Sequence, residues 1–244
     1  MSSQPPVICV LGMHRSGTSC LAGSLELCGV FFGDVQRANR YNPKGNRERI
    51  DINRLNDLVL AESGGSWHGP PTSVRWTSEH ARMRDAILQV YFDAADGPWG
   101  FKDPRFTFTL PFWRDALPDL RVVASFRHPI AVALSLARRN QFTSTKSLSV
   151  WSSYNQQMLT QLIESSFPLI WFDAPDDEYR QRLRAIIRHL GIKADSRTEE
   201  FFDPDLRHHK SPAVPGPVSA LPSNVESIYD GLMQYYQAAL TGNP

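Results

Sequence analysis

The chain has 244 residues, and 41% of them are hydrophobic, which is typical of a globular protein with one sizeable core. Its 26 basic and 25 acidic side chains leave a formal net charge of +1, which argues against the broad positive field of a general nucleic-acid binder. We therefore expect a single domain over residues 1–244 with no nucleic-acid partner, in which any anion site is local.

The three cysteines, Cys9, Cys20 and Cys28, have a spacing that fits no zinc site, redox pair or secreted disulfide framework. A reducing compartment is the simplest interpretation. The sequence shows no signal-peptide pattern at its start and no run of about 18 apolar residues suited to a membrane helix. We expect a cytoplasmic protein without membrane insertion, and the sequence carries no indication of its oligomeric state.

Apolar patterning in the first part of the chain predicts a strand followed by helices. A continuous apolar run at Val7–Leu11 predicts a strand buried on both faces, with a helix behind it. Two amphipathic helices follow, one beginning near Asn46 with Glu48 in its first turn, and one behind Ser78. We expect them to form a helical side segment over about residues 46–95.

The second part of the chain alternates short strands with helices. Strands are predicted at Trp99–Lys102, Arg121–Phe126 and Pro168–Phe172. Helices are predicted at Pro129 to about Asn140, Leu148 to Glu164, Tyr179 to Leu190 and about Asn224 to Leu240. The Pro-rich residues 195–223 are interpreted as an ordered, lid-like loop. This alternation predicts an α/β fold, a three-layer sandwich around a mostly parallel sheet, with ligands at the carboxyl ends of the strands.

The loop Gly12-Met-His-Arg-Ser-Gly-Thr-Ser19 joins the first strand to its helix and has the GxxxxG frame of a phosphate-binding loop (P-loop). In that motif backbone N–H groups and the helix N-terminus hold a phosphate. The lysine that nucleotide hydrolases place after the second glycine is Thr18 here, and the cation of the loop is Arg15. Asp173 is the only candidate for a magnesium ligand at a strand end, which disfavours a kinase or ATPase. The residues expected to bind the phosphate group are Gly12, His14, Arg15, Ser16, Gly17, Thr18 and Ser19.

Arg127 and Ser135 form a second candidate anion site. Arg127 leaves the end of a strand, and Ser135 lies about two turns into the next helix, so that both can reach one phosphate. The alternative is an arginine paired with an acidic neighbour and a serine that fills a helix interface. Two anion sites at neighbouring strand ends predict a ligand with two separate phosphate groups.

These motifs resemble those of sulfotransferases that use 3′-phosphoadenosine 5′-phosphosulfate (PAPS). The Gly12–Ser19 loop is similar to the family's 5′-phosphosulfate loop in its Arg-bearing, carbohydrate-type and bacterial variant, and Arg127 with Ser135 resembles its 3′-phosphate site. Segments 42–48 and 101–113 also look like a bacterial branch. The resemblance covers most of residues 7–192 and implies a P-loop NTPase-like sulfotransferase fold.

The resemblance implies in-line transfer of a sulfuryl group from PAPS to the hydroxyl of a glycan or another small-molecule acceptor, with adenosine 3′,5′-bisphosphate as product and no metal required. Arg15 would replace the family's loop lysine, and Lys102 would assist the sulfuryl oxygens. The histidine that cytosolic members place two residues after the lysine is Pro104 here, so a carboxylate base is the better model. Glu48 is expected as the general base, with His14 and Asp103 as alternatives. A P-loop kinase or NTPase and a non-catalytic nucleotide-binding module are the competing functions.

Further residues allow two interpretations each. Arg105 binds an acidic acceptor or pairs with Asp103. Trp67 and Trp76 stack on an acceptor or anchor their loop. The basic run 207–210 closes over the nucleotide or is simply solvated.

Overall fold

The structure is a computed structural model that describes residues 5–36, 38, 42–203 and 221–241. Its elements in chain order are β1 (Val7–Leu11), α1 (Thr18–Leu27), α2 (Ile50–Glu62), α3 (Ser78–Ala94), β2 (Trp99–Lys102), α4 (Phe106–Arg114), β3 (Arg121–Phe126), α5 (Pro129–Asn140), α6 (Ser144–Ser165), β4 (Leu169–Trp171), α7 (Asp176–His189) and α8 (Ser223–Leu240). Within these described ranges, no helix has the length and apolar character to span a membrane.

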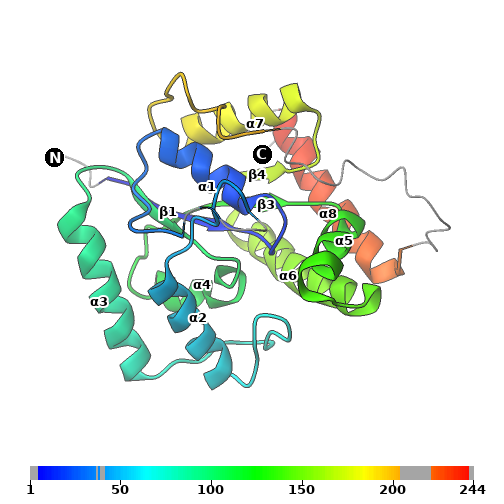
Figure 1. Cartoon of the computed structure of the whole chain (residues 1–244), viewed down its shortest axis with the longest axis horizontal. Helices are drawn as coiled ribbons and strands as arrows, with labels where there is room; N and C mark the ends of the chain where they lie inside the picture. Colours follow the sequence, from blue (N-terminus) through cyan, green and yellow to red (C-terminus); the bar gives the residue numbers. More distant parts are fainter. Residues whose placement is uncertain (1–4, 37, 39–41, 204–220, 242–244) are drawn as a thin grey trace.

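The four strands form one parallel sheet in the order β2-β1-β3-β4. Figure 1 shows α1 and α7 on one side of the sheet and α4 and α6 on the other, so the predicted α/β fold is confirmed. The central strand β1 is buried from Ile8 to Leu11, as expected for a strand covered on both faces. Because the strands are parallel, the loops that follow all four strands emerge at the same edge of the sheet.

The helix predicted to begin near Asn46 begins instead at Ile50, so the prediction of Glu48 in its first turn is wrong. The backbone before the helix is held by a neighbouring segment: the Gln36 amide donates to the Glu48 carbonyl at 2.8 Å, and the Asn46 amide donates to the Gln36 carbonyl at 3.2 Å. These bonds keep the backbone out of the helical conformation until the N-cap, Arg49. Glu48 therefore lies in a connector, and its position is not that of an ordinary acid in the first turn of a helix.

Helix α4 is an element that the apolar pattern did not predict. Its sequence alternates Phe and Thr before Pro111, a pattern that suits a strand better than a helix. A proline inside a helix leaves the carbonyl four residues earlier without its N–H donor. Here the carbonyl of Thr107 accepts a hydrogen bond from Nε2 of Gln161 on α6, at 2.9 Å. A partner distant in sequence thus compensates for the proline.

Two helix starts differ from the predicted ones because a threonine provides the cap. Thr77, not Ser78, caps α3, and its hydroxyl accepts from the His80 amide at 3.2 Å. Helix α6 begins at Ser144, ahead of the predicted Leu148, with the Thr143 hydroxyl accepting from the amide of Lys146 at 3.2 Å.

Candidate functional site

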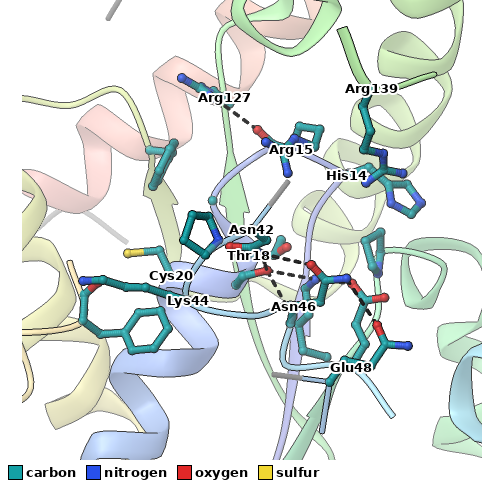
Figure 2. A pocket seen from close by; sticks show the side chains of 18 of the residues that line it. His14, Arg15, Thr18, Cys20, Asn42, Lys44, Asn46, Glu48, Arg127 and Arg139 are labelled. Atoms are coloured by element: carbon teal, nitrogen blue, oxygen red, sulfur yellow. Dashed lines mark hydrogen bonds and ion pairs between the residues drawn. The ribbon is translucent and has the colours of Figure 1, made fainter. Parts of the chain in front are cut away.

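A cleft of about 670 Å³ opens at the edge of the sheet where the strands end. Figure 2 shows side chains from the Gly12–Ser19 loop, the 42–48 connector, the end of β3 and α5 around it, and Lys102 at the end of β2 also belongs to its lining. Its lining contains His14, Arg15, Gly17, Thr18, Ser19, Cys20, Gln36, Asn42, Pro43, Lys44, Asn46, Glu48, Asn53, Lys102, Pro104, Arg105, Arg127, Arg139, Asn140, Phe172, Phe201 and Asp203. The strand ends singled out in the sequence therefore meet around one cavity.

Two glycines allow the Gly12–Ser19 loop to lie close against the strand ends. Gly12 has a φ of 132°, and a Cβ there would lie 2.2 Å from the carbonyl oxygen of Ser125 on β3. Gly17 has a φ of 84°, and its Cβ would lie 2.1 Å from the ring of Phe172. Both positions combine a left-handed or unusual backbone with close approach, which only glycine accommodates. The loop is fixed further by the Ser125 hydroxyl, which donates to the Ser16 carbonyl at 2.6 Å.

The N-terminus of α1 faces the cleft without a side-chain cap. Its N-cap is Gly17, and no side chain of the described residues accepts a hydrogen bond there. The first amides of a helix have no partner within the helix, and they lie at the positive end of its dipole. Thr18 and Ser19, which begin the helix, both line the cleft. This arrangement suits a bound anion.

Glu48, Lys102 and Ser19 form a polar cluster in the cleft. Nζ of Lys102 donates to Oε1 of Glu48 at 2.5 Å and lies 3.4 Å from Oγ of Ser19. The second carboxylate oxygen of Glu48 accepts from Nδ2 of Asn53 at 3.0 Å. Lys102 is 4% exposed and Glu48 is 8% exposed, so this ion pair is largely shielded from water. The structure thus brings the expected base and the expected cation into direct contact.

Ser19 also ties the loop to the 42–46 turn. Its hydroxyl donates to the carbonyl of Asn46 at 3.0 Å and accepts from Nδ2 of Asn42 at 3.2 Å. The sequence analysis notes that segment 42–48 resembles a family motif, but it assigns no role to Asn42 or Asn46.

Arg127 and Ser135 both reach Arg15, although they come from different elements. Ser135 on α5 accepts from Nε of Arg15 at 2.7 Å, and Nη1 of Arg127 lies 3.4 Å from the Arg15 carbonyl. Arg127 also forms an ion pair with Asp173 at 2.9 Å, which is the alternative role considered for this arginine. The other oxygen of Asp173 accepts from the His128 amide at 2.9 Å. Both oxygens of this candidate magnesium ligand are therefore engaged by the protein.

Positive groups concentrate around the loop. Burial, followed by the charges of Arg139 and Arg127, lowers the pKa of Arg15 to about 10. Arg139 also lines the cleft, and the sequence analysis does not single it out. It lies one helical turn after Ser135 on α5, a spacing that places both side chains on the same face of the helix. Crowded cations of this kind are stabilised by an anion bound among them.

His14 lies in the wall of the cleft and packs against aromatic rings. Its ring centroid is 4.7 Å from that of Trp67 and 5.8 Å from that of Tyr154. Burial first, and then the charges of neighbouring arginines and Lys102, hold the pKa of His14 well below its usual value. Nε2 of His14 is buried and has no hydrogen-bond partner among the described residues. The side chain is therefore neutral at neutral pH.

Asp103 is fully buried and is absent from the lining of the cleft. One of its oxygens accepts from Nη1 of Arg105 at 2.9 Å, and the other accepts from Nδ2 of Asn56 at 2.9 Å. Arg105 also pairs with Asp57 at 2.6 Å. Of the two interpretations of Arg105, the structure shows the ion pair with Asp103.

The two loop tryptophans contact other aromatic side chains. Trp67 stacks on Phe142 with ring centroids 5.8 Å apart, and Trp76 packs edge-on against Phe112 at 5.5 Å. Neither tryptophan lines the cleft. Both therefore anchor the loop before α3. The basic run 207–210 lies outside the described residues.

Comparison with solved structures shows the same fold. The sulfotransferase domain of the Synechococcus PCC 7002 olefin synthase has a TM-score of 0.58 at 15% identity, with 96% of this chain and 97% of that chain covered. The sulfotransferase domain from the curacin biosynthetic pathway has a TM-score of 0.61 at 14% identity, with 95% and 99% covered. A sulfotransferase from Mycobacterium tuberculosis H37Rv gives 0.53 at 14% identity, with 95% and 77% covered.

The solved structures show the fold, whereas comparison of the sequence with family models identifies the family. A search of curated proteins finds no significant match. The family model described as "Sulfotransferase family", in contrast, matches residues 6–196, which include the loop, the connector, the sheet and the cluster around Lys102. Since this match spans most of the chain, the protein belongs to the sulfotransferase family.

Proposed function

We propose that this protein transfers the sulfuryl group of PAPS to an acceptor hydroxyl in the 670 Å³ cleft, with Glu48 as general base. The observation that carries the proposal is the buried contact between Lys102 and Glu48 beside the uncapped N-terminus of α1. One carboxylate, one cation and an anion-binding helix terminus are the groups that such a transfer needs.

The residues present fit a donor with two phosphate positions. The uncapped amides at the start of α1, together with Arg15, support binding of the 5′-phosphosulfate. Arg127, which lines the cleft, supports binding of a second phosphate close by. Ser135 is absent from the lining and supports that binding through its contact with Arg15. A guanidinium presents several N–H donors in a fixed plane, which matches phosphate oxygens. Binding there requires Arg127 to exchange part of its contact with Asp173 for the phosphate.

In the proposed reaction the acceptor oxygen attacks sulfur as its proton passes to the Glu48 carboxylate. The bond between sulfur and the phosphate oxygen breaks, and its electron pair stays on the departing bisphosphate. Lys102, whose Nζ lies between Glu48 and Ser19, is placed to turn toward the sulfuryl or bridging oxygens. That movement would also release Glu48 to accept the proton. Arg15 and the loop amides would stabilise the charge on the leaving phosphate.

The surroundings of the three candidate bases favour Glu48. Asp103 is fully buried with both oxygens hydrogen-bonded, and it does not line the cleft. His14 has a depressed pKa and a buried Nε2, which makes it a weak base. Glu48 lines the cleft, and Asn53 holds one of its oxygens in place.

The first test is a transfer screen with radiolabelled PAPS over glycan, lipid and phenol acceptors, followed by the Glu48→Gln variant. We expect this variant to bind adenosine 3′,5′-bisphosphate within about twofold of the unmodified protein and to lose about 100-fold or more in turnover, since general base catalysis contributes roughly this much. Glu62→Gln, at the exposed end of α2, is the matched control and should transfer label normally. Label transfer by Glu48→Gln at a rate near that of the control would contradict the assignment of the base.

A further inference from the structure

A second cavity, of about 640 Å³, lies where β4 begins, away from the carboxyl ends of the strands that form the cleft. Its walls come from the end of α6 and from α7 and α8, which Figure 1 shows around β4. Apolar side chains such as Leu162, Phe167 and Ile186 contribute to the lining. Among the residues that the structure describes, the lining contains no acidic side chain, and Arg182 and His189 are its members that can carry positive charge. Its volume is within the range of small-molecule sites.

Arg182 is the unusual feature of this cavity. The residue is 9% exposed, yet it forms no ion pair with a carboxylate of the described chain. Its Nε donates to the carbonyl of Leu169 at 2.7 Å, and its Nη1 lies 3.4 Å from the carbonyl of Ala239. Other buried arginines of this protein have a carboxylate partner: Arg84 pairs with Asp115 at 2.9 Å. Arg127 likewise pairs with Asp173.

The environment of Arg182 is therefore complementary to an anion. Burial of a cation without an anionic partner is unfavourable, and this burial lowers the pKa of the Arg182 guanidinium. Two main-chain carbonyls supply partial negative charge only, and they occupy Nε and Nη1. The contacts of the described residues leave Nη2 without a protein partner, and Arg182 lines the cavity.

We propose that this cavity binds a small monocarboxylate with an apolar body, such as a medium-chain fatty acid. The carboxylate would accept a hydrogen bond from Arg182, and the hydrocarbon would lie against Leu162, Phe167 and Ile186. The buried guanidinium matches one negative charge, and the apolar part of the wall adds hydrophobic burial for a hydrocarbon chain. This site is separate from the cleft, and the proposal does not depend on sulfuryl transfer.

The test is calorimetric titration of the full-length protein with octanoate, with 1-octanol as the uncharged analogue. We expect one octanoate per chain and at least tenfold weaker binding of 1-octanol. Arg182→Met should weaken octanoate at least tenfold and leave 1-octanol unchanged. Arg184→Met is the matched control, because it removes the same charge from an exposed position of the same helix; it should bind octanoate normally.

A second variant keeps the proposal testable if Arg182→Met fails to fold. Ala185→Trp fills the cavity and retains Arg182, and it should abolish binding of octanoate. The proposal is overturned if the unmodified protein shows no saturable binding of octanoate up to millimolar concentration. It is also overturned if Ala185→Trp binds octanoate normally, or if adenosine 3′,5′-bisphosphate competes with octanoate, since competition would place the ligand in the cleft.

Discussion

Arg15 is the residue on which the two proposed phosphate positions converge. Its Nε donates to Ser135, its carbonyl lies 3.4 Å from Arg127, and its backbone has a left-handed φ of 67°. A non-glycine residue in this conformation costs of the order of 1–3 kcal/mol and persists only where its surroundings hold it. The loop thus stores strain at the point where it directs a cation into the cleft.

His14, next to Arg15, should make folding stability depend on pH. Its pKa in the folded protein lies well below the usual value, so as pH falls through about 6.5 the unfolded chain binds a proton that the folded chain does not. The stability from a neutral His14 is therefore present above this pH and is lost below it. His14→Phe keeps an aromatic ring there without a titrating group.

We expect acidification from about pH 7.5 to about pH 5.5 to lower the free energy of unfolding of the unmodified protein by up to about 1.4 kcal/mol more than that of His14→Phe. Urea unfolding of both proteins at both pH values measures this difference. Equal losses in the two proteins would show that His14 takes up its proton in the folded state as readily as in the unfolded chain.

At the scale of elements, the turn from β1 into α1 determines the shape of the anion site. Gly17 and Gly29 flank α1 and have nearly the same left-handed φ, 84° and 86°. A Cβ at Gly17 would lie 2.1 Å from the Phe172 ring, whereas a Cβ at Gly29 would meet nothing within 4 Å. The same substitution at the two glycines therefore distinguishes the cost of a left-handed backbone alone from the added cost of a steric contact.

Gly29→Ala should cost about 1–2 kcal/mol of unfolding free energy, which is the cost of a left-handed non-glycine residue. Gly17→Ala should cost more, because Phe172 must also move, and it should weaken binding of adenosine 3′,5′-bisphosphate at least tenfold. Denaturant unfolding and calorimetry on the two variants provide the comparison. Equal costs and equal affinities would mean that the contact with Phe172 has no role in shaping the loop.

The elements that the sequence predicted are those with an unambiguous apolar period. The buried runs at β1, β2 and β3 match the predicted strands residue for residue. The errors arose where distant contacts override the local pattern: Gln36 holds Glu48 outside α2, and Gln161 satisfies the carbonyl that Pro111 leaves free in α4. Neither partner can be identified from spacing along the chain.

At the scale of the whole molecule, the parallel sheet explains why the charged residues of the site gather at one edge. The near-zero net charge of the chain conceals a local excess of cations: among the described residues, the cleft is lined by six lysines and arginines and by two acidic residues, Glu48 and Asp203. The sequence indicated which strand ends would carry this charge, because carboxyl ends of parallel strands share an edge. It could not indicate that Arg15 would contact Ser135, since this pair comes from elements that meet only in the folded chain. Nor could it indicate that Asn53 would hold Glu48, because that contact depends on where α2 begins.

The central claim is that this cleft recognises the two phosphate groups of a sulfuryl donor. It is tested most directly by calorimetric titration with adenosine 3′,5′-bisphosphate in the presence of a chelator, compared with ATP and magnesium. We predict saturable binding of the bisphosphate without metal, at least tenfold tighter than ATP with magnesium, and loss of that preference in Arg127→Met. Tighter binding of ATP with magnesium would contradict sulfuryl transfer and support a kinase or NTPase.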